Sequence, residues 1–150
     1  MRSHARSTDK PEVKVGNFRH LAWFRYRLRR FLRFSERVAR SYGITPQQHQ
    51  LLLGVAGYTG RGYATISELA EFLQARHNAV VGLVQRAVRH GLVRKIPSQR
   101  DRRFVRVLLT RHGLSALKKI SRANIKELRT LRFEILKENP PRRIPAAQGA

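Results

Sequence analysis

Apolar residues recur at helical spacing in two long stretches near the two ends of the chain. Between residues 17 and 42 they fall mostly on one stripe, and Gly43 provides a natural C-terminal stop. A second stripe starts after Thr110 and continues toward Pro140-Pro141. The pattern therefore predicts two long amphipathic helices, 17–42 and 111–138.

The intervening chain predicts shorter helices with recognisable starts. Thr45-Pro46 is typical of an N-cap followed by proline at the first helical position, and that helix is expected to be buried and broken by the glycines at 57, 60 and 62. Thr65-Ile66-Ser67-Glu68 matches a capping box. A turn at 74–76 then leads to another helix over about 77–89.

Two short β-like segments follow, residues 92–96 and 104–109, around a polar loop. Helix, turn, helix and then a basic β-hairpin is the order of a winged helix-turn-helix. The expected fold is mainly α with a small β-hairpin wing (α+β), flanked by long N- and C-terminal helices.

The charge of the chain indicates what kind of partner it binds rather than how it folds. The 150 residues contain 32 Lys and Arg against 9 Asp and Glu, a net charge of +23. Such a balance favours a polyanionic partner and disfavours an enzyme that acts on cationic substrates. The stretch 44–75 is nearly neutral, as expected for a buried scaffold, whereas 76–110 is strongly basic.

The absence of cysteine excludes disulfides, thiolate metal sites and thiol redox sensing. There is no run of eighteen apolar residues and no signal-peptide pattern, so we expect no membrane partner and a cytoplasmic, nucleoid-associated protein. The expected organisation is a flexible basic arm over 1–16, a folded unit over 17–138 with its winged part at 44–110, and a disordered tail over 139–150.

The helix 77–89 and the turn before it carry side chains suited to reading DNA bases. Arginine can bond guanine bidentately, and Asn or Gln can bond adenine, in a major groove that admits one helix. The residues expected to contact DNA here are Gln74, Arg76, His77, Asn78, Val81, Gln85 and Arg86. Arg89 ranks below the N-terminal positions, as a phosphate contact.

Several segments resemble the MarR family of transcriptional regulators over about residues 17–137. The strongest match is Ser98-Gln99-Arg100-Asp101-Arg102-Arg103 followed by Val107-Leu108-Leu109-Thr110-Arg111-His112-Gly113. It is similar to the wing signature of that family, and 43–48, 65–70 and 90–95 also match. The resemblance implies that Arg103 enters the minor groove and that Asp101 braces the loop. The expected wing contacts are Arg94, Lys95, Ser98, Gln99, Arg100, Asp101, Arg102 and Arg103.

The apolar stripes of the two long helices are broader than one small winged domain can cover. The resemblance implies a homodimer built from these helices, and packing within one chain is the alternative. The residues expected in the dimer interface are Phe18, Leu21, Leu28, Leu117, Leu128, Leu131 and Ile135.

A small aromatic or lipophilic effector is the other partner that the family implies. An aromatic stripe can equally be ordinary core, but the cleft for such a ligand is expected at His20, Trp23, Phe24, Tyr42 and Tyr58. The six histidines have no metal-ligand spacing, and no catalytic motif is visible, so we expect no cofactor, no metal, no catalytic residue and no enzyme activity.

The function expected from the sequence is a sequence-specific double-stranded DNA-binding transcriptional regulator, a repressor acting as a homodimer on a pseudo-palindromic operator and released by a small-molecule effector. Three alternatives stay open: a sequence-tolerant, nucleoid-type DNA-binding protein, an RNA-binding protein, and a protein-binding scaffold. The basic hairpin lacks the stacking aromatics of single-strand RNA platforms, which disfavours RNA.

Overall fold

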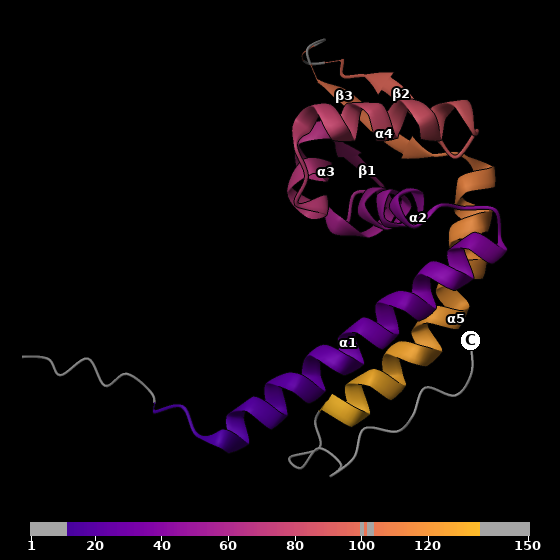
Figure 1. The fold of residues 1–150 in the computed structure, drawn as a ribbon. Helices are drawn as coiled ribbons and strands as arrows, with labels where there is room; N and C mark the ends of the chain where they lie inside the picture. Colours follow the sequence, from indigo (N-terminus) through magenta and orange to yellow (C-terminus); the bar gives the residue numbers. More distant parts are fainter. Residues whose placement is uncertain (1–11, 100, 102–103, 136–150) are drawn as a thin grey trace, which may run out of the picture.

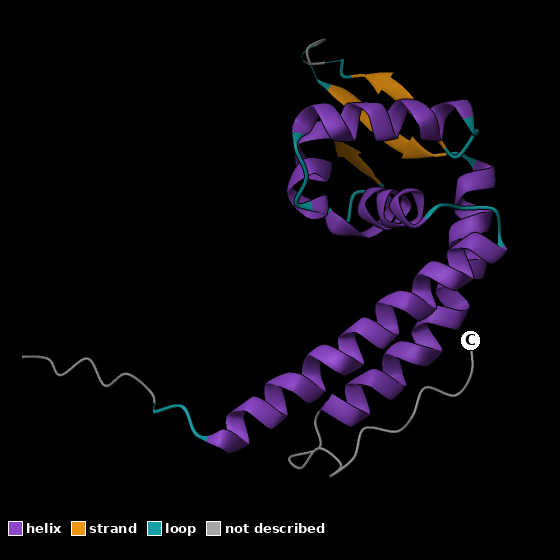
Figure 2. Cartoon of the chain, viewed as in Figure 1, coloured by secondary structure: helices purple, strands orange, loops and turns teal. Residues whose placement is uncertain are grey.

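Helices dominate the computed structural model, which describes residues 12–99, 101 and 104–135 (Figures 1 and 2). The expected class, mainly α with a small β wing, is confirmed. In chain order the elements are α1 (Val15–Ser41), α2 (Pro46–Leu53), the π-helical turn η1 (Gly54–Tyr58), β1 (Tyr63–Thr65), α3 (Ile66–Leu73), α4 (His77–Arg89), β2 (Val93–Pro97), β3 (Val105–Leu109) and α5 (Arg111–Ile135).

Reciprocal capping boxes start α2 and α3, the two helices that precede α4. The Gln48 N–H donates to Thr45 Oγ1 at 3.2 Å, and the Thr45 N–H donates to Gln48 Oε1 at 3.1 Å. Thr65 and Glu68 repeat the arrangement at the start of α3. Each box satisfies amide groups that a helix N-terminus would otherwise leave unpaired, so α2 and α3 begin at fixed residues.

The sheet has three strands where the sequence predicted only a hairpin. β3 lies in the middle and pairs antiparallel with β2 and with β1, with Ala64 opposite Val107. β1 was missed because three residues are too few to display a period. The helix also continues past Leu53 as η1. It is Gly60 and Gly62, at φ values of 70° and 76°, that turn the chain into β1.

The winged domain, residues 44–110, contains most of the buried core, which Ala39 of α1 and Ile120 of α5 complete. Leu51, Leu52 and Leu69 are fully buried, as are Val84 of α4 and Val107 of β3. The start of α5 rests directly on this unit. A Cβ at position 113 would overlap the carbonyl oxygen of Leu92, so only glycine permits this close approach.

The pair α1 and α5, called the leg below, extends away from the winged domain (Figure 1). A buried ion pair between Arg27 and Glu134 joins the two helices, and Asn124 donates to Ser35 Oγ at 3.0 Å. α1 begins at Val15, two residues before the predicted start, because the Asn17 side chain accepts from the Lys14 N–H at 2.8 Å.

Parts of three predictions lie outside the described residues. They are the arm over 1–11, the end of the last helix over 136–138, and the tail over 139–150. Among the residues that the structure does describe, no helix has the length and hydropathy needed to cross a membrane.

Candidate nucleic-acid interface

The turn before α4 fixes the direction in which that helix leaves α3. Gln74 ends α3 in the left-handed conformation, at φ 50°, and Arg76 precedes α4 in an extended conformation. At the other end of α4, the Gln48 side-chain amide donates to His90 Nδ1 at 2.7 Å. The second helix of the motif is therefore held at both ends by the winged domain.

One side of α4 is buried and the opposite side is open. Val80, Leu83, Val84 and Ala87 face the core. With 100° between successive residues, the opposite side consists of positions 78, 82, 85 and 89. These are the exposed Asn78, Gln85 and Arg89, with Gly82 between them. Because Gly82 has no side chain, nothing projects from the helix backbone in the middle of this face.

The other predicted residues of this helix surround that face. Gln74, Arg76 and His77 are exposed at the N-terminal end, and Val81 is partly buried. Arg86 is exposed on the flank toward α2, where it lines a hollow with Gln47 and Gln50. Arg89 shares the outward face with Asn78, so its geometry does not support the lower rank expected from the sequence.

The two strands of the wing, β2 and β3, pair along their whole length. Arg94 and Lys95 are exposed on β2, opposite Leu108 and Val107 of β3. Across the loop, the Ser98 N–H donates to the Phe104 carbonyl at 2.8 Å, and the Phe104 N–H donates to the Asp101 carbonyl at 3.0 Å. Gln99 is exposed. Arg100, Arg102 and Arg103 lie outside the described residues.

Sequence reasoning missed a basic cluster beside the wing. The guanidinium carbons of Arg61 and Arg106 lie 4.6 and 4.9 Å from the centre of the Tyr63 ring, which is within cation–π range. The cluster joins β1 to β3, and the only signal for it was the lone arginine at 106 in an apolar strand. Arg61 also pairs with Glu68 at 2.5 Å.

The capping role of Glu68 favours its charged form. The hydrogen bond from the Thr65 backbone, with a smaller contribution from Arg61, lowers the pKa of the Glu68 carboxyl. The start of α3 is therefore tied electrostatically to the Arg61–Tyr63–Arg106 cluster.

A cavity of about 580 Å³ lies where α1, α2 and α5 meet. Its walls are mostly apolar, but His49 Nε2 and Asn124 Oδ1 are buried in it without a hydrogen-bond partner among the described residues. Burial lowers the pKa of His49. The lining residues are Phe31, Leu32, Ser35, Glu36, Pro46, His49, Gln50, Leu53, Ser121, Asn124, Ile125 and Leu128.

The residues predicted for a ligand cleft lie apart from this cavity. His20, Phe24 and Tyr42 are exposed on or just after α1, and none of the five predicted residues lines the cavity. Trp23 stacks on Tyr26 with ring centres 5.5 Å apart, and Tyr58 packs against Phe72 at 5.2 Å. The aromatic positions were identified by residue type, whereas the cavity forms where three helices diverge.

The predicted dimer residues divide into two groups. Phe18, Leu21, Leu28 and Leu128 are exposed or nearly half-exposed in the single chain, and Ile135 is partly buried. Leu117 and Leu131 are each only 6% exposed. These two leucines pack within one chain, which leaves little of either side chain exposed to a second copy.

Fold and site together define a winged helix-turn-helix with a long helical leg. Residues 42–103 match the model of the MarR family. Over these residues the winged helix-turn-helix of this chain is similar to the MarR family, in agreement with the sequence resemblance.

One curated relative and two solved structures are also similar to this chain. The transcriptional activatory protein BadR of Rhodopseudomonas palustris is 31% identical over 77 residues, which are 51% of this chain and 44% of BadR. The match therefore spans less than half of BadR.

AbsC, a MarR family transcriptional regulator from Streptomyces coelicolor, has a TM-score of 0.69 at 19% identity, over 86% of each chain. A mutant MarR from E. coli, complexed with operator DNA, has a TM-score of 0.62 at 20% identity, over 85% of this chain and 89% of MarR. At these identities, the two structures show that the fold is shared.

Proposed function

We propose that the protein is a transcriptional regulator that binds double-stranded DNA in a sequence-specific way. The outward face of α4 carries this proposal, because Asn78, Gln85 and Arg89 project on one side from a helix whose other side is fixed in the core. These side chains match the donor and acceptor pattern of base edges in the major groove. The operator complex of MarR supports the same use of the fold.

The wing and the basic cluster beside it supply the sequence-independent contacts. Arg94 and Lys95 are exposed on β2, and the guanidinium groups of Arg61 and Arg106 flank Tyr63. Phosphate contacts of this kind release counterions and provide much of the affinity. The family resemblance adds Arg103 as the minor-groove contact and Asp101 as its brace.

The active form is a homodimer closed through the leg. Leu21 is 57% exposed and Phe18 is 59% exposed in one chain, an arrangement that a monomer in water would not favour. A two-fold axis through this surface presents two α4 helices. They fit half-sites of a pseudo-palindrome about 34 Å apart.

A small aromatic or lipophilic effector regulates DNA binding from the cavity. Its apolar walls suit such a molecule, and His49 Nε2 and Asn124 Oδ1 offer hydrogen bonds to one polar group. Because α1, α2 and α5 all line the cavity, occupancy changes how the leg meets the winged domain. Filling the space with Ser35→Phe should abolish thermal stabilisation by small aromatic acids and phenols.

The regulator acts in the cytoplasm on chromosomal DNA, and repression is its expected output. BadR is named as an activatory protein, so the sign of regulation needs its own measurement. Expression of a reporter gene placed behind the selected operator measures the sign of regulation. Expression that rises when the protein is deleted indicates repression, and expression that falls indicates activation.

Selection from random duplex DNA at near-physiological salt tests the function itself, with duplex RNA as competitor. We expect a pseudo-palindrome with half-sites one helical turn apart. Tight binding without an enriched motif would replace the proposal with a nucleoid-type DNA-binding protein, and preference for RNA would replace it with an RNA-binding protein. Absence of nucleic-acid binding from a folded dimer would favour a protein-binding scaffold.

A further inference from the structure

α1 carries far more charge than a packing helix needs. It contains eight arginines and a single acidic residue, Glu36. Arg27 is buried and pairs with Glu134 of α5. The exposed remainder includes a row spaced at helical intervals, called the arginine stripe below: Arg29, Arg33, Arg37 and Arg40.

Little within the described part of the chain neutralises this stripe. Glu36 contacts Arg40 at 3.7 Å, at the end of the stripe nearest the winged domain. Arg29, Arg33 and Arg37 form no ion pair with any residue among 12–99, 101 and 104–135. Successive members lie about 6 Å apart along the helix axis, so four guanidinium groups cover roughly 16 Å.

Most of the stripe lies on a different side of α1 from the apolar surface, and Arg29 is the member that borders it, in a hollow shared with Leu28 and Leu32. The exposed apolar side chains on α1 include Leu21, Phe24, Leu28 and Leu32. At 100° per residue this row lies roughly 130° around the helix from the arginine stripe. A second copy that covers the apolar row therefore leaves Arg33, Arg37 and Arg40 open to another partner, with Arg29 at the edge of the covered surface.

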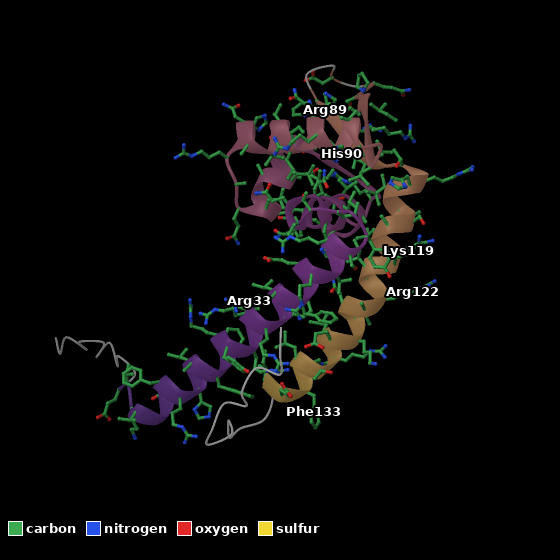
Figure 3. All side chains as sticks on the ribbon, turned by 45° about the vertical axis from the view of Figure 1, so that its right-hand side comes forward. Arg33, Arg89, His90, Lys119, Arg122 and Phe133 are labelled. Carbon is green, nitrogen blue, oxygen red and sulfur yellow. The ribbon has the colours of Figure 1, made fainter. Side chains whose placement is uncertain are left out.

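The stripe is also separate from the face of α4. The part of α1 that carries it runs from the junction with the winged domain down the leg, away from α4 (Figure 1). Figure 3 shows Arg33 on the opposite side of the leg from Lys119 and Arg122 of α5, and well away from Arg89 at the end of α4. A straight duplex seated on α4 and the wing does not run along this part of α1.

We propose that the arginine stripe binds the phosphate backbone of a second segment of duplex DNA, so that one dimer bridges two duplexes. The inference rests on the proposed function, because the winged domain holds the first duplex. The stripe reads no sequence: its guanidinium groups bond phosphate oxygens in their fork geometry and displace condensed counterions.

Duplex DNA fits this surface better than a lipid surface does. Between residues 29 and 40, this side of α1 presents five arginines and Glu36, and the exposed Leu32 lies at its edge, beside Arg29. A helix that lies in a membrane interface needs an apolar face beside its basic one. The apolar row of α1 is the one that the dimer covers.

Ternary-complex formation tests the bridge. The dimer is first saturated with an immobilised duplex that carries the selected operator, and a labelled duplex of unrelated sequence is then added. The test variant is Arg29→Gln/Arg33→Gln/Arg37→Gln, because glutamine has nearly the same helix propensity as arginine. The matched control removes three charges from the other side of the leg, as Lys118→Gln/Arg122→Gln/Lys126→Gln.

The wild type and the control should retain the second duplex, and the stripe variant should lose it while still binding the operator as the wild type does. For the second duplex, the slope of log affinity against log salt concentration should fall by roughly three in the stripe variant. Retention of the second duplex by the stripe variant, or an equal loss in both variants, would overturn the proposal.

Two further experiments distinguish failure of the second-duplex proposal from failure of the proposed function. Duplex RNA and vesicles of phosphatidylcholine and phosphatidylserine in equal parts replace the second duplex, and stripe-dependent binding of either in preference to DNA would overturn the assignment. If the wild type selects no operator, a random duplex is offered instead. If only the stripe variant then loses binding to the random duplex, the proposal that the stripe binds DNA is supported although the proposed function has failed. If the stripe variant and the control bind the random duplex equally well, that proposal is overturned.

Discussion

The winged domain and the leg are built from the same kind of amphipathic sequence, but only the winged domain completes its packing within one chain. Leu51, Leu52 and Leu69 are fully buried there. On the leg, Phe18 and Leu21 remain more than half exposed. Helical periodicity therefore identifies which residues leave water without telling whether their partner is the same chain or a second one.

The largest effect is expected in the winged domain. Leu52→Ala removes a side chain that is fully buried, and it should lower the free energy of unfolding by about 2–5 kcal/mol because the core cannot close over the cavity. Chemical denaturation measures it, and the loss should not depend on protein concentration. Leu53 is the adjacent control at 38% exposure. Leu53→Ala should cost less than about 1 kcal/mol, and equal losses would mean that the core boundary is misplaced.

A charge on the apolar row of the leg should have the next largest effect. Leu21→Glu should weaken the dimer by about 2 kcal/mol or more, roughly 30-fold in its dissociation constant, because an ionised carboxylate would be buried in the interface. Sedimentation equilibrium measures this, with circular dichroism to confirm that the chain still folds. Arg33→Glu places the same carboxylate on the arginine stripe and should leave the dimer intact. Dissociation of both variants to the same extent would reject the apolar row as the interface.

Two substitutions, Asn78→Ala on α4 and Lys95→Ala on the wing, distinguish base recognition from phosphate binding. The substitution should relax preference at one base position in each half-site by about 1–3 kcal/mol, because a side chain on the outward face of α4 is removed. Lys95→Ala should instead weaken binding to all sequences alike and reduce the salt slope by about one. Binding measured against a set of single-base operator variants distinguishes these results. A uniform loss for Asn78→Ala would make that residue a phosphate contact.

The sequence predicted the elements whose signals are local. The capping boxes at Thr45 and Thr65 and the glycine at 43 mark helix boundaries through the chemistry of one or a few residues, and the structure places the boundaries there. β1 could not be predicted in the same way, because its three residues become a strand only by pairing with β3.

The candidate site was predictable to a similar degree. The exposed residues of α4 followed from its period and from the family resemblance. The cavity did not, because Phe31, His49 and Asn124 come from three helices and meet only in the tertiary structure. Burial of Leu117 and Leu131 depends in the same way on how α5 packs within the chain, which periodicity alone does not specify.

His49 gives the smallest of these effects, at the junction where the winged domain and the leg meet. Its side chain is buried, and although Glu36 lines the same cavity, desolvation dominates and lowers the pKa of His49. The folded state therefore keeps the imidazole neutral at a pH where the unfolded chain already binds a proton. Stability from this group is complete above the unfolded pKa of about 6.5 and is lost as the pH falls from there toward the lower folded value. For one proton, the slope of the free energy of unfolding against pH is at most about 1.4 kcal/mol per pH unit. Urea denaturation of the wild type and of His49→Gln across this range measures the difference. Parallel pH profiles would mean that His49 takes up its proton equally in the folded and unfolded states, and that the junction is open to water.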